Sequence, residues 1–425
     1  MKKSNYLVLL LTLIVSLSLQ AQEINSPYSR FGLGLLHGEN VNTSLMGMGG
    51  IAIGVSDPTM VNPGNAASYA VFDSTTFVFD IGLTGNLTTL KTSLQSESSS
   101  FVTLSYIMFG FPITKWWKSS LGMLPFSKIG YDVKIFIPVD KFSNVINEIE
   151  GDGGLNQFFW GNAFKINENL RLGIDAAFIF GQGSRSSKVY FPDSLYIFGT
   201  KTINHTRGSD FIFDYGIQYD FNFSNTRKLT LGAIYSNNWK LNVKREYLAN
   251  TFTGGYGDVV ETLQDTVAYT PEEKGTLTIP QRFGLGFTYQ EKERWLIGAD
   301  FEWQNWEEYT AFGISDSLDN AWRIAIGGQY SPKHTSISSL AKRMYYRLGI
   351  RYTNSYLSIF GKPINEYGIS FGLTFPLKKS RTAIDLGIEY GRRGTTDNNL
   401  IQENFLNFSL GFSIHEHWFH KRKYQ

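Results

Sequence analysis

The sequence predicts an all-β fold: a transmembrane antiparallel β-barrel of about 14 strands with an N-terminal hatch inside its lumen. Three observations lead to this prediction. Apolar and polar residues alternate along many segments, and the links between those segments alternate between long and short. After the leader, no stretch approaches the ~20 apolar residues of a membrane-spanning helix.

The composition narrows the class before any element is placed. The 425 residues include 42 Gly, 33 Phe, 23 Tyr and 9 Trp, a mixture that favours strands over helices. The chain has no Cys, which excludes disulfides, thiol nucleophiles, thiolate metal sites and a lipidated N-terminal cysteine. The 39 basic and 37 acidic residues nearly balance, so we expect no nucleic-acid partner. No cofactor is indicated.

Residues 1–21 have the pattern of a secretory signal peptide. Lys2 and Lys3 precede an apolar run over residues 6–19, and Ala21 offers a small residue at the expected cleavage point. Cleavage there removes two lysines and leaves 37 basic against 37 acidic side chains. We therefore expect an exported, outer-membrane protein with a hatch over residues 22–73, a barrel over residues 74–415 and a basic periplasmic tail over residues 416–425.

Each predicted strand has one apolar side and one polar or small side. From residue 211 to 221, large apolar residues at odd positions alternate with Ile, Asp, Gly, Gln and Asp. Because successive strand side chains point to opposite faces, such a strand has one lipid-facing and one lumen-facing side. The predicted strands are residues 77–86, 101–111, 119–137, 155–165, 172–180, 211–221, 229–235, 283–289, 295–303, 322–330, 346–352, 367–375, 384–390 and 406–414.

The links between these strands provide an independent test. Links after odd-numbered strands are long, among them residues 183–208 and 246–279, whereas most links after even-numbered strands are short. Long external loops that alternate with short periplasmic turns are typical of outer-membrane barrels. Residues 331–343 depart from this rule, because they should form a short turn and do not.

Residues 30–68 precede the first strand and are rich in glycine, with no sustained period. The segment is too apolar for a solvated linker, so a hatch inside the barrel is favoured over a disordered leader. Asn62, Pro63 and Gly64 predict a tight turn in it: Asn bonds nearby backbone, Pro fixes φ at about −65° and Gly admits a positive φ. We expect this hatch turn to anchor the hatch and not to contact a ligand.

Several motifs occur in the same order as in a known family. They are MGMGGIAIGVSDP from residue 46, NPGNAA from residue 62, LPF from residue 124, IPQRFGLG from residue 279, DFEW from residue 300 and the positions from Trp322 to Tyr330. With these motifs the chain resembles the FadL/TodX family of outer-membrane transporters for hydrophobic compounds. That family usually has Ala where this chain has Gly64.

The resemblance implies that a hydrophobic, fatty-acid-like small molecule is captured outside the cell and released sideways into outer-membrane lipid. The exit is a gap at a kinked third strand. Gly122, Pro125 and Gly130 fit such a kink, because Pro cannot donate to the sheet ladder and Gly permits a bulge. An ordinary edge kink without transport is the alternative.

Eight charged residues fall on the predicted lumen side of the strands. We expect them mainly to pair across strands, with the steering of a ligand as the alternative. They are Asp214, Asp300, Glu302, Arg323, Arg347, Arg351, Asp385 and Glu389.

Two short patterns suggest chemistry but favour barrel structure. The stretch from Gly368 through Ser370 to Gly372 matches the nucleophile pattern of hydrolases, yet the alternation continues through it, which predicts a strand. His415, His417 and His420 lie beside aromatic and basic residues at the end of the last strand, which favours a periplasmic boundary over a metal site. We expect neither an enzyme nor a metal protein.

Two functions of different class remain open. One is the uptake of hydrophobic small molecules. The other is a non-transporting barrel subunit of an outer-membrane protein-secretion or barrel-assembly complex, whose partners are other outer-membrane or lipoprotein subunits. Uptake, with lateral release, is the function we expect, and the complex subunit is the alternative. The long links at residues 246–279 and 331–343, and the lack of obvious binding residues, are the points in favour of the alternative.

Overall fold

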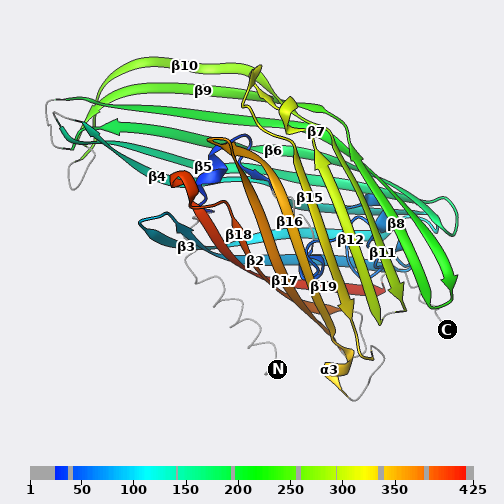
Figure 1. The fold of residues 1–425 in the computed structure, drawn as a ribbon. Coiled ribbons are helices and arrows are strands. Elements are labelled where there is room, and N and C mark those ends of the chain that lie inside the picture. The colour runs from blue at the N-terminus through cyan, green and yellow to red at the C-terminus, as the bar shows by residue number, and fades with distance from the viewer. Residues whose placement is uncertain are drawn as a thin grey trace, which may run out of the picture.

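The computed structural model describes residues 24–36, 42–139, 142–192, 197–254, 260–292, 294–333, 339–377 and 382–417. The predicted signal peptide, His420 and most of the predicted tail lie outside these residues. Long antiparallel strands make up most of the described chain (Figure 1). No helix among the described residues is both long enough and apolar enough to span a membrane.

Fourteen strands close into an antiparallel barrel in the described part of the chain, which confirms the predicted fold class. Closure is made by the last strand, which pairs with the first from His417 opposite Thr76 to Gln402 opposite Lys91. The strands are β2 (Thr76–Lys91), β3 (Ser96–Pro112), β4 (Trp117–Val139), β5 (Phe142–Lys165), β6 (Leu170–Tyr190), β7 (Gly199–Ser224), β8 (Arg227–Ser236), β11 (Arg282–Glu291), β12 (Trp295–Gln304), β15 (Ala321–Tyr330), β16 (Tyr345–Ile359), β17 (Lys362–Pro376), β18 (Ala383–Arg393) and β19 (Gln402–His417).

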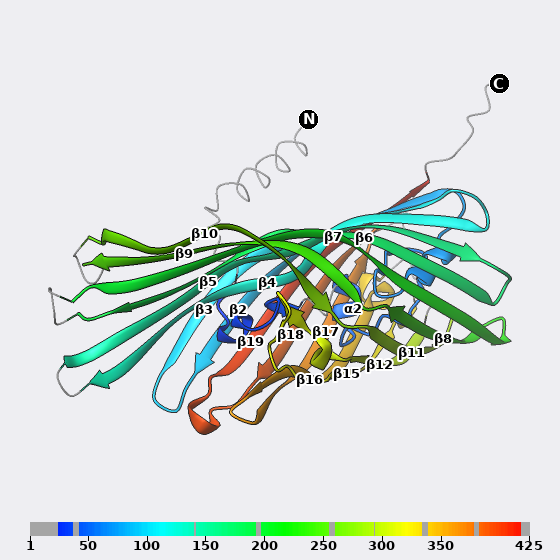
Figure 2. The same cartoon turned by 90° about the horizontal axis from the view of Figure 1, so that it is seen from above.

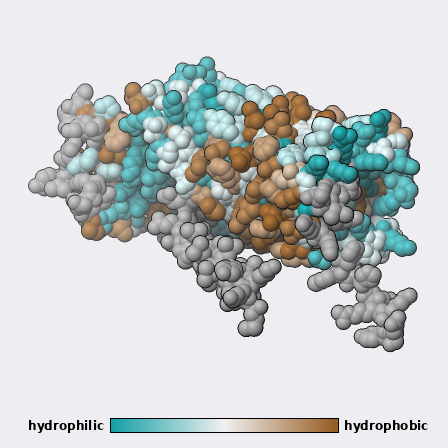
Figure 3. All heavy atoms as spheres, turned by 90° about the horizontal axis from the view of Figure 1, so that it is seen from below, coloured by the Kyte–Doolittle hydropathy of each residue, from teal (hydrophilic) through white to brown (hydrophobic). Residues whose placement is uncertain are grey.

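The outer wall carries the apolar side of each strand. On β7, Tyr215 and Tyr219 are 44% and 38% exposed, whereas Gln218 is fully buried on the lumen side. Exposed aliphatic and aromatic side chains repeat on the neighbouring strands, and Figure 3 shows them gathered around the middle of the molecule, with hydrophilic residues toward its ends. This is the apolar band that an outer-membrane barrel presents to lipid.

The barrel continues past this band at one end, here called the extended end. β4, β5, β6 and β7 have 23, 24, 21 and 26 residues, whereas about 9–11 residues cross a bilayer. β9 (Trp239–Thr253) and β10 (Thr262–Ile279) form a hairpin that extends the sheet at this end. β9 pairs with β10 and with the outer part of β7. β8 and β11 pair with each other in the barrel wall. Figure 2 shows β9, β10 and their neighbours projecting past the other strands.

Several segments predicted as external loops are therefore strands. The predicted links over residues 183–208 and 246–279 fall largely within β6, β7, β9 and β10. From Thr262 to Glu272 every residue of β10 is exposed. With both faces in water, this strand lacks the alternation of apolar and polar residues by which the sequence identifies the barrel strands.

The opposite end, here called the short-turn end, carries brief connections such as that between β5 and β6. A longer connection between β15 and β16 contains α3 (Leu340–Arg343), within the predicted long link over residues 331–343. β19 runs to His417, so residues 416 and 417 of the predicted tail belong to a strand. The remaining elements are η1 (Pro27–Arg30), β1 (Leu35–Leu36), α2 (Thr43–Met46), η2 (Ala66–Val71), η3 (Trp306–Glu308), β13 (Thr310–Ala311), β14 (Ile314–Ser315) and η4 (Asp397–Asn399).

Candidate functional site: a filled lumen and a gap in its wall

Residues 42–73, here called the inner segment, lie within the lumen toward the short-turn end. Leu45, Met48 and Ile53 are at most 1% exposed. Glycines in the wall let the segment approach closely, since a Cβ on Gly232 would lie 2.1 Å from the carbonyl oxygen of Ile53. The barrel wall and the segment are thus packed backbone against backbone.

Three of the predicted lumen charges bind this segment directly. Asp300 accepts hydrogen bonds from the amides of Ala52 and Ile53 at 2.5 and 2.9 Å. Arg323 donates to two successive carbonyl oxygens of the segment at 2.9 and 3.1 Å, and Asp385 accepts from a serine hydroxyl of the segment at 2.7 Å. These side chains supply the partners that buried backbone and hydroxyl groups require.

The predicted lumen charges also pair with one another and with Arg282 across the sheet, on the adjacent strand for Arg323 and Glu302 and on the next strand but one for the other three pairs. In a lumen of this kind such pairs keep each buried charge beside one of opposite sign. The pairs are Arg351 with Glu389 at 2.5 Å, Arg323 with Glu302 at 2.9 Å, Asp214 with Arg282 at 3.3 Å, and Arg347 with Asp385 at 3.6 Å.

Asn62, Pro63 and Gly64 form a turn within the inner segment. The buried Asn62 side chain accepts from the Gly64 amide at 3.0 Å and donates to the carbonyl oxygens of Ala52 and Val55 at 2.8 and 3.0 Å. Gly64 does not adopt the positive φ that the sequence suggested. The reason for a glycine at this position is instead steric, because a Cβ on residue 64 would lie 2.5 Å from the Cβ of Ala52.

β3 and β4 separate part-way along the wall. Their pairing ends at Ile107 opposite Met123, although both strands continue, and β4 has a bulge between Pro125 and Ser127. Beyond Met123 the wall therefore has a gap on the β3 side of β4. The predicted kink residues are all on β4 at this place: Gly122, Pro125 and Gly130.

Residues 24–36, here called the sealing segment, occupy the edge of β4 inside this gap. β1 belongs to the segment and pairs with β4, with Leu35 opposite Lys128 and Leu36 opposite Ser127. The chain thus adds a short strand of its own where β3 has left.

Gly130 provides the second attachment of the sealing segment. Its carbonyl oxygen accepts from the Ser26 amide at 2.8 Å, and its amide donates to the Ser29 hydroxyl at 3.0 Å. A Cβ on Gly130 would lie 2.2 Å from the carbonyl oxygen of Ile24. Glycine is required here because the segment lies directly on the strand.

A charged network that the sequence analysis missed holds the sealing segment from the other side. The Ser26 hydroxyl donates to Glu403, and Arg393 pairs with Glu403 at 2.8 Å and with Glu366 at 2.5 Å. Glu366 in turn pairs with Arg351 at 2.6 Å. These residues continue the lumen-facing positions of β17, β18 and β19 past the predicted strand ends, so a longer alternation would have revealed them.

A cavity of about 400 Å³ remains in the lumen between the two segments. Phe126, Trp239 and Tyr356 line it together with the charged Arg351 and Glu366. Its size is within the range of small-molecule pockets, and its wall is mainly apolar with a few charged groups, as is usual for them.

The lumen is covered at the extended end by the connection that follows β12. Trp306, only 1% exposed, stacks on Tyr356 with 4.5 Å between ring centroids. Tyr309 and Leu318 of the same connection are buried in one cluster with Tyr28 of the sealing segment. The cover and the sealing segment therefore pack as one unit.

The two weaker sequence patterns lie in the barrel wall. Ser370 is buried mid-strand in β17, where its hydroxyl accepts from the Gly49 amide at 2.8 Å, so it does not occupy a strand-to-helix turn. His415 is buried 3.9 Å from Asp73. The side chains of His417 and His420 lie outside the described residues.

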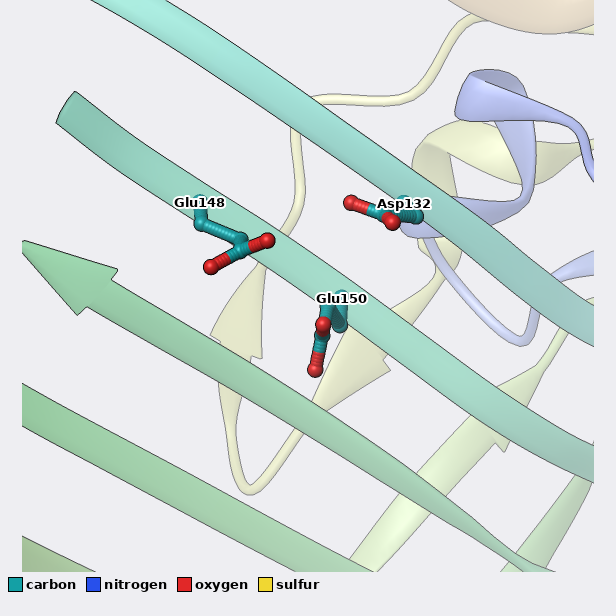
Figure 4. A group of neighbouring side chains, drawn as sticks. All are labelled: Asp132, Glu148 and Glu150. Carbon is teal, nitrogen blue, oxygen red and sulfur yellow. The ribbon is translucent and has the colours of Figure 1, made fainter. Parts of the chain in front are cut away.

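Figure 4 shows a cluster of three carboxylates, Asp132, Glu148 and Glu150, on the extended parts of β4 and β5. Their oxygen atoms lie within 4.8 Å of one another. Lys134 pairs with Glu148 at 2.7 Å, and Asp132 and Glu150 are exposed. No other described residue at this place points to a metal ion, so the cluster is a surface charge.

The sequence matches a family model described as BamG over residues 1–425. The chain belongs to the BamG family. No curated protein matches its sequence significantly.

Solved structures similar to this BamG-family barrel include the toluene transporter TodX of Pseudomonas putida, with a TM-score of 0.59, 13% identity, and coverage of 91% of this chain and 100% of the other. The toluene transporter TbuX of Ralstonia pickettii has a TM-score of 0.59 at 12% identity over 89% and 99% of the two chains. A FadL homologue of Pseudomonas aeruginosa has a TM-score of 0.58 at 14% identity over 89% and 98%. The predicted resemblance to the FadL/TodX family is thus confirmed for the fold, which is a closed antiparallel β-barrel.

Proposed function

We propose that this chain is a closed outer-membrane barrel that serves as a non-transporting subunit of an outer-membrane protein-assembly complex. The observation that carries the proposal is the occupied gap: the sealing segment is bonded to β4 through β1 and through Gly130. Because backbone hydrogen bonds hold the sealing segment in the gap, the gap offers no open lateral exit in this structure.

Further contacts support a closed state. The inner segment fills the lumen toward the short-turn end, and Trp306 and Tyr309 cover the extended end. Opening any of these places separates buried polar groups from their partners, each at a cost of about 1–3 kcal/mol. Such a filled barrel is suited to a structural role in the membrane.

The match to the BamG family model over the whole chain is a further hint toward the same proposal. The partners we infer are other outer-membrane and lipoprotein subunits. In this proposal the signal peptide is cleaved near residue 21, residues 22–73 form the hatch, the barrel extends from residue 74 to the end of β19 at His417, and residues 418–425 form a periplasmic tail.

Purification of the tagged full chain in mild detergent, without crosslinking, tests the proposal. We expect stoichiometric recovery of outer-membrane assembly proteins, and fewer folded barrels in cells depleted of the chain. Recovery of the chain alone, with normal levels of other barrels in depleted cells, would contradict it.

A second candidate is the uptake of a hydrophobic, fatty-acid-like small molecule, and the cavity of about 400 Å³ favours it. The similar solved structures include proteins named as toluene transporters. In this case the ligand binds in the cavity and leaves through the gap into lipid when the sealing segment detaches. Loss of labelled toluene or fatty-acid uptake on deletion, restored by the wild-type chain, would support this candidate.

A further inference from the structure

β4 has a second open stretch beyond the sealing segment. Residues 131–139 pair with β5 on one side, and no described residue pairs with them on the other. The amide and carbonyl of Gly130 face this open side, because both bond to the sealing segment. Since strand backbone groups alternate between the two sides, those of Asp132, Lys134 and Phe136 face it as well.

This open edge is apolar and lies in water. Ile135, Phe136 and Ile137 are 41%, 63% and 44% exposed. β4 enters the wall at Trp117 and needs about 9–11 residues to cross the bilayer, so these side chains lie beyond the apolar band. An unpaired apolar edge in water is a template for an additional strand.

The other open edge of the extended end, on β10, is protected by contrast. Three register shifts interrupt its pairing with β9, and Pro271 lies within it. Bulges and prolines of this kind prevent strand addition. β4 pairs with β5 without a shift from residue 127 to 137, and its own proline and register shift come only at Pro138 and between Ile137 and Val139, so the open edge is regular over residues 131–137.

The nearer part of the same edge already accepts an added strand. β1 pairs with β4 at Ser127 and Lys128, only three residues before Tyr131. The open stretch is therefore continuous with an existing strand addition, the same mode by which extended peptides join sheet edges.

The acidic cluster beside the edge indicates the charge of the partner. Asp132, Glu148 and Glu150 lie together (Figure 4), and Lys134 pairs with Glu148. A second copy of this edge would bring a like cluster opposite, and like charges on facing strands repel. A partner strand with Lys or Arg at this place compensates the negative charge instead.

We propose that the edge of β4 over residues 131–137 binds an extended segment of a partner protein, which adds to the sheet as a further strand. The segment carries apolar side chains against Ile135, Phe136 and Ile137 and a basic side chain beside the acidic cluster. The inference rests on the proposed function, because it names the surface through which the subunit joins its complex.

Phe136→Pro tests the inference on the full chain in its native membrane complex. Proline removes the open-side amide of residue 136 and leaves the pairing of β4 with β5 intact, because that amide faces away from β5. Phe136→Leu, which keeps the amide and an apolar side chain, is the matched control. The double variant Asp132→Lys/Glu150→Lys tests the charge without altering the backbone.

We expect the wild type and Phe136→Leu to co-purify with the partner protein. Phe136→Pro and the charge-reversal variant should both lose this partner. Hydrogen exchange of the Asp132, Lys134 and Phe136 amides should be slower by about tenfold or more in the wild-type complex than in the chain stripped of partners. The amides on the open edge of β10 serve as the internal reference.

A complex that survives both variants, with those three amides exchanging at the rate of the stripped chain, overturns the inference and leaves the proposed function standing. A wild-type chain that purifies alone overturns both. If Phe136→Pro does not fold, the exchange rates in the wild type and the charge-reversal variant decide the question.

Discussion

Asn62 joins two stretches of the inner segment through one buried side chain. Asn62→Ala leaves two carbonyl oxygens and one amide without their partners, at about 1–3 kcal/mol for each group that stays unsatisfied. We expect the inner segment to loosen inside a folded barrel, with faster proteolysis of residues 42–73 and a higher conductance in planar bilayers. Asn167→Ala removes a similar side-chain turn in an exposed connection and should change neither. Equal behaviour of the two variants would reject the anchoring role.

Gly130 is the residue on which the sealing segment lies. Gly130→Ala places a Cβ 2.2 Å from the Ile24 carbonyl oxygen, so we expect the segment to be displaced from β4. Since the chain has no cysteine, a Leu33→Cys reporter in the sealing segment, at a position only 6% exposed in the wild type, measures this directly. Maleimide labelling of the reporter should rise with Gly130→Ala and stay low with Gly85→Ala, where a Cβ meets only ordinary contacts. Slow labelling in both variants would mean that the segment is not held at Gly130.

At the scale of elements, the alternation of long and short connections predicts which turns face the outside. Leu94 lies in the connection from β2 to β3 and Trp116 in that from β3 to β4, and both are well exposed, at 90% and 55%. On intact cells, a membrane-impermeant maleimide should label Leu94→Cys and not Trp116→Cys. Both should react after the outer membrane is permeabilised. Labelling of Trp116→Cys on intact cells would reverse the assigned orientation.

The fourteen barrel strands could be predicted because each has one face in lipid and one in the lumen. Apolar and polar residues therefore alternate along each strand. β10 could not, since both of its faces are in water between Thr262 and Glu272. The sealing segment was missed for a different reason. Ser26 bonds to Gly130 and Glu403, residues far away in the sequence, and no local pattern reports a contact of that range.

The lumen charges illustrate an intermediate case. The alternation of apolar and polar residues predicts that these charged side chains face the lumen, but it does not predict which groups they bind. The sequence suggested pairing across strands, which Arg351 and Glu389 make, whereas Asp300 binds the amides of Ala52 and Ile53. A carboxylate that faces the lumen looks the same in sequence whether it meets an arginine or a backbone amide.

At the scale of the whole molecule, the membrane band and the extended end form one continuous sheet. β4, β5, β6 and β7 run without interruption from the short turns through the band and beyond it. The band therefore fixes the direction in which the edge of β4 projects, while the filled lumen keeps the wall from deforming. This combination suits a barrel that presents a surface outside the membrane.

A disulfide across the gap separates the two candidate functions. Leu36 and Ser127 lie directly opposite each other in the pairing of β1 with β4, at the spacing of facing residues that a disulfide can bridge. We expect oxidised Leu36→Cys/Ser127→Cys to fold, to recover the same partners and to support growth like the wild type, because a subunit that never opens loses nothing when its gap is locked. The single-cysteine variants, with and without reductant, control for the substitutions themselves. Loss of function that appears only in the oxidised double variant and returns on reduction would mean that the sealing segment must leave β4, and would favour the release of a hydrophobic ligand through the gap.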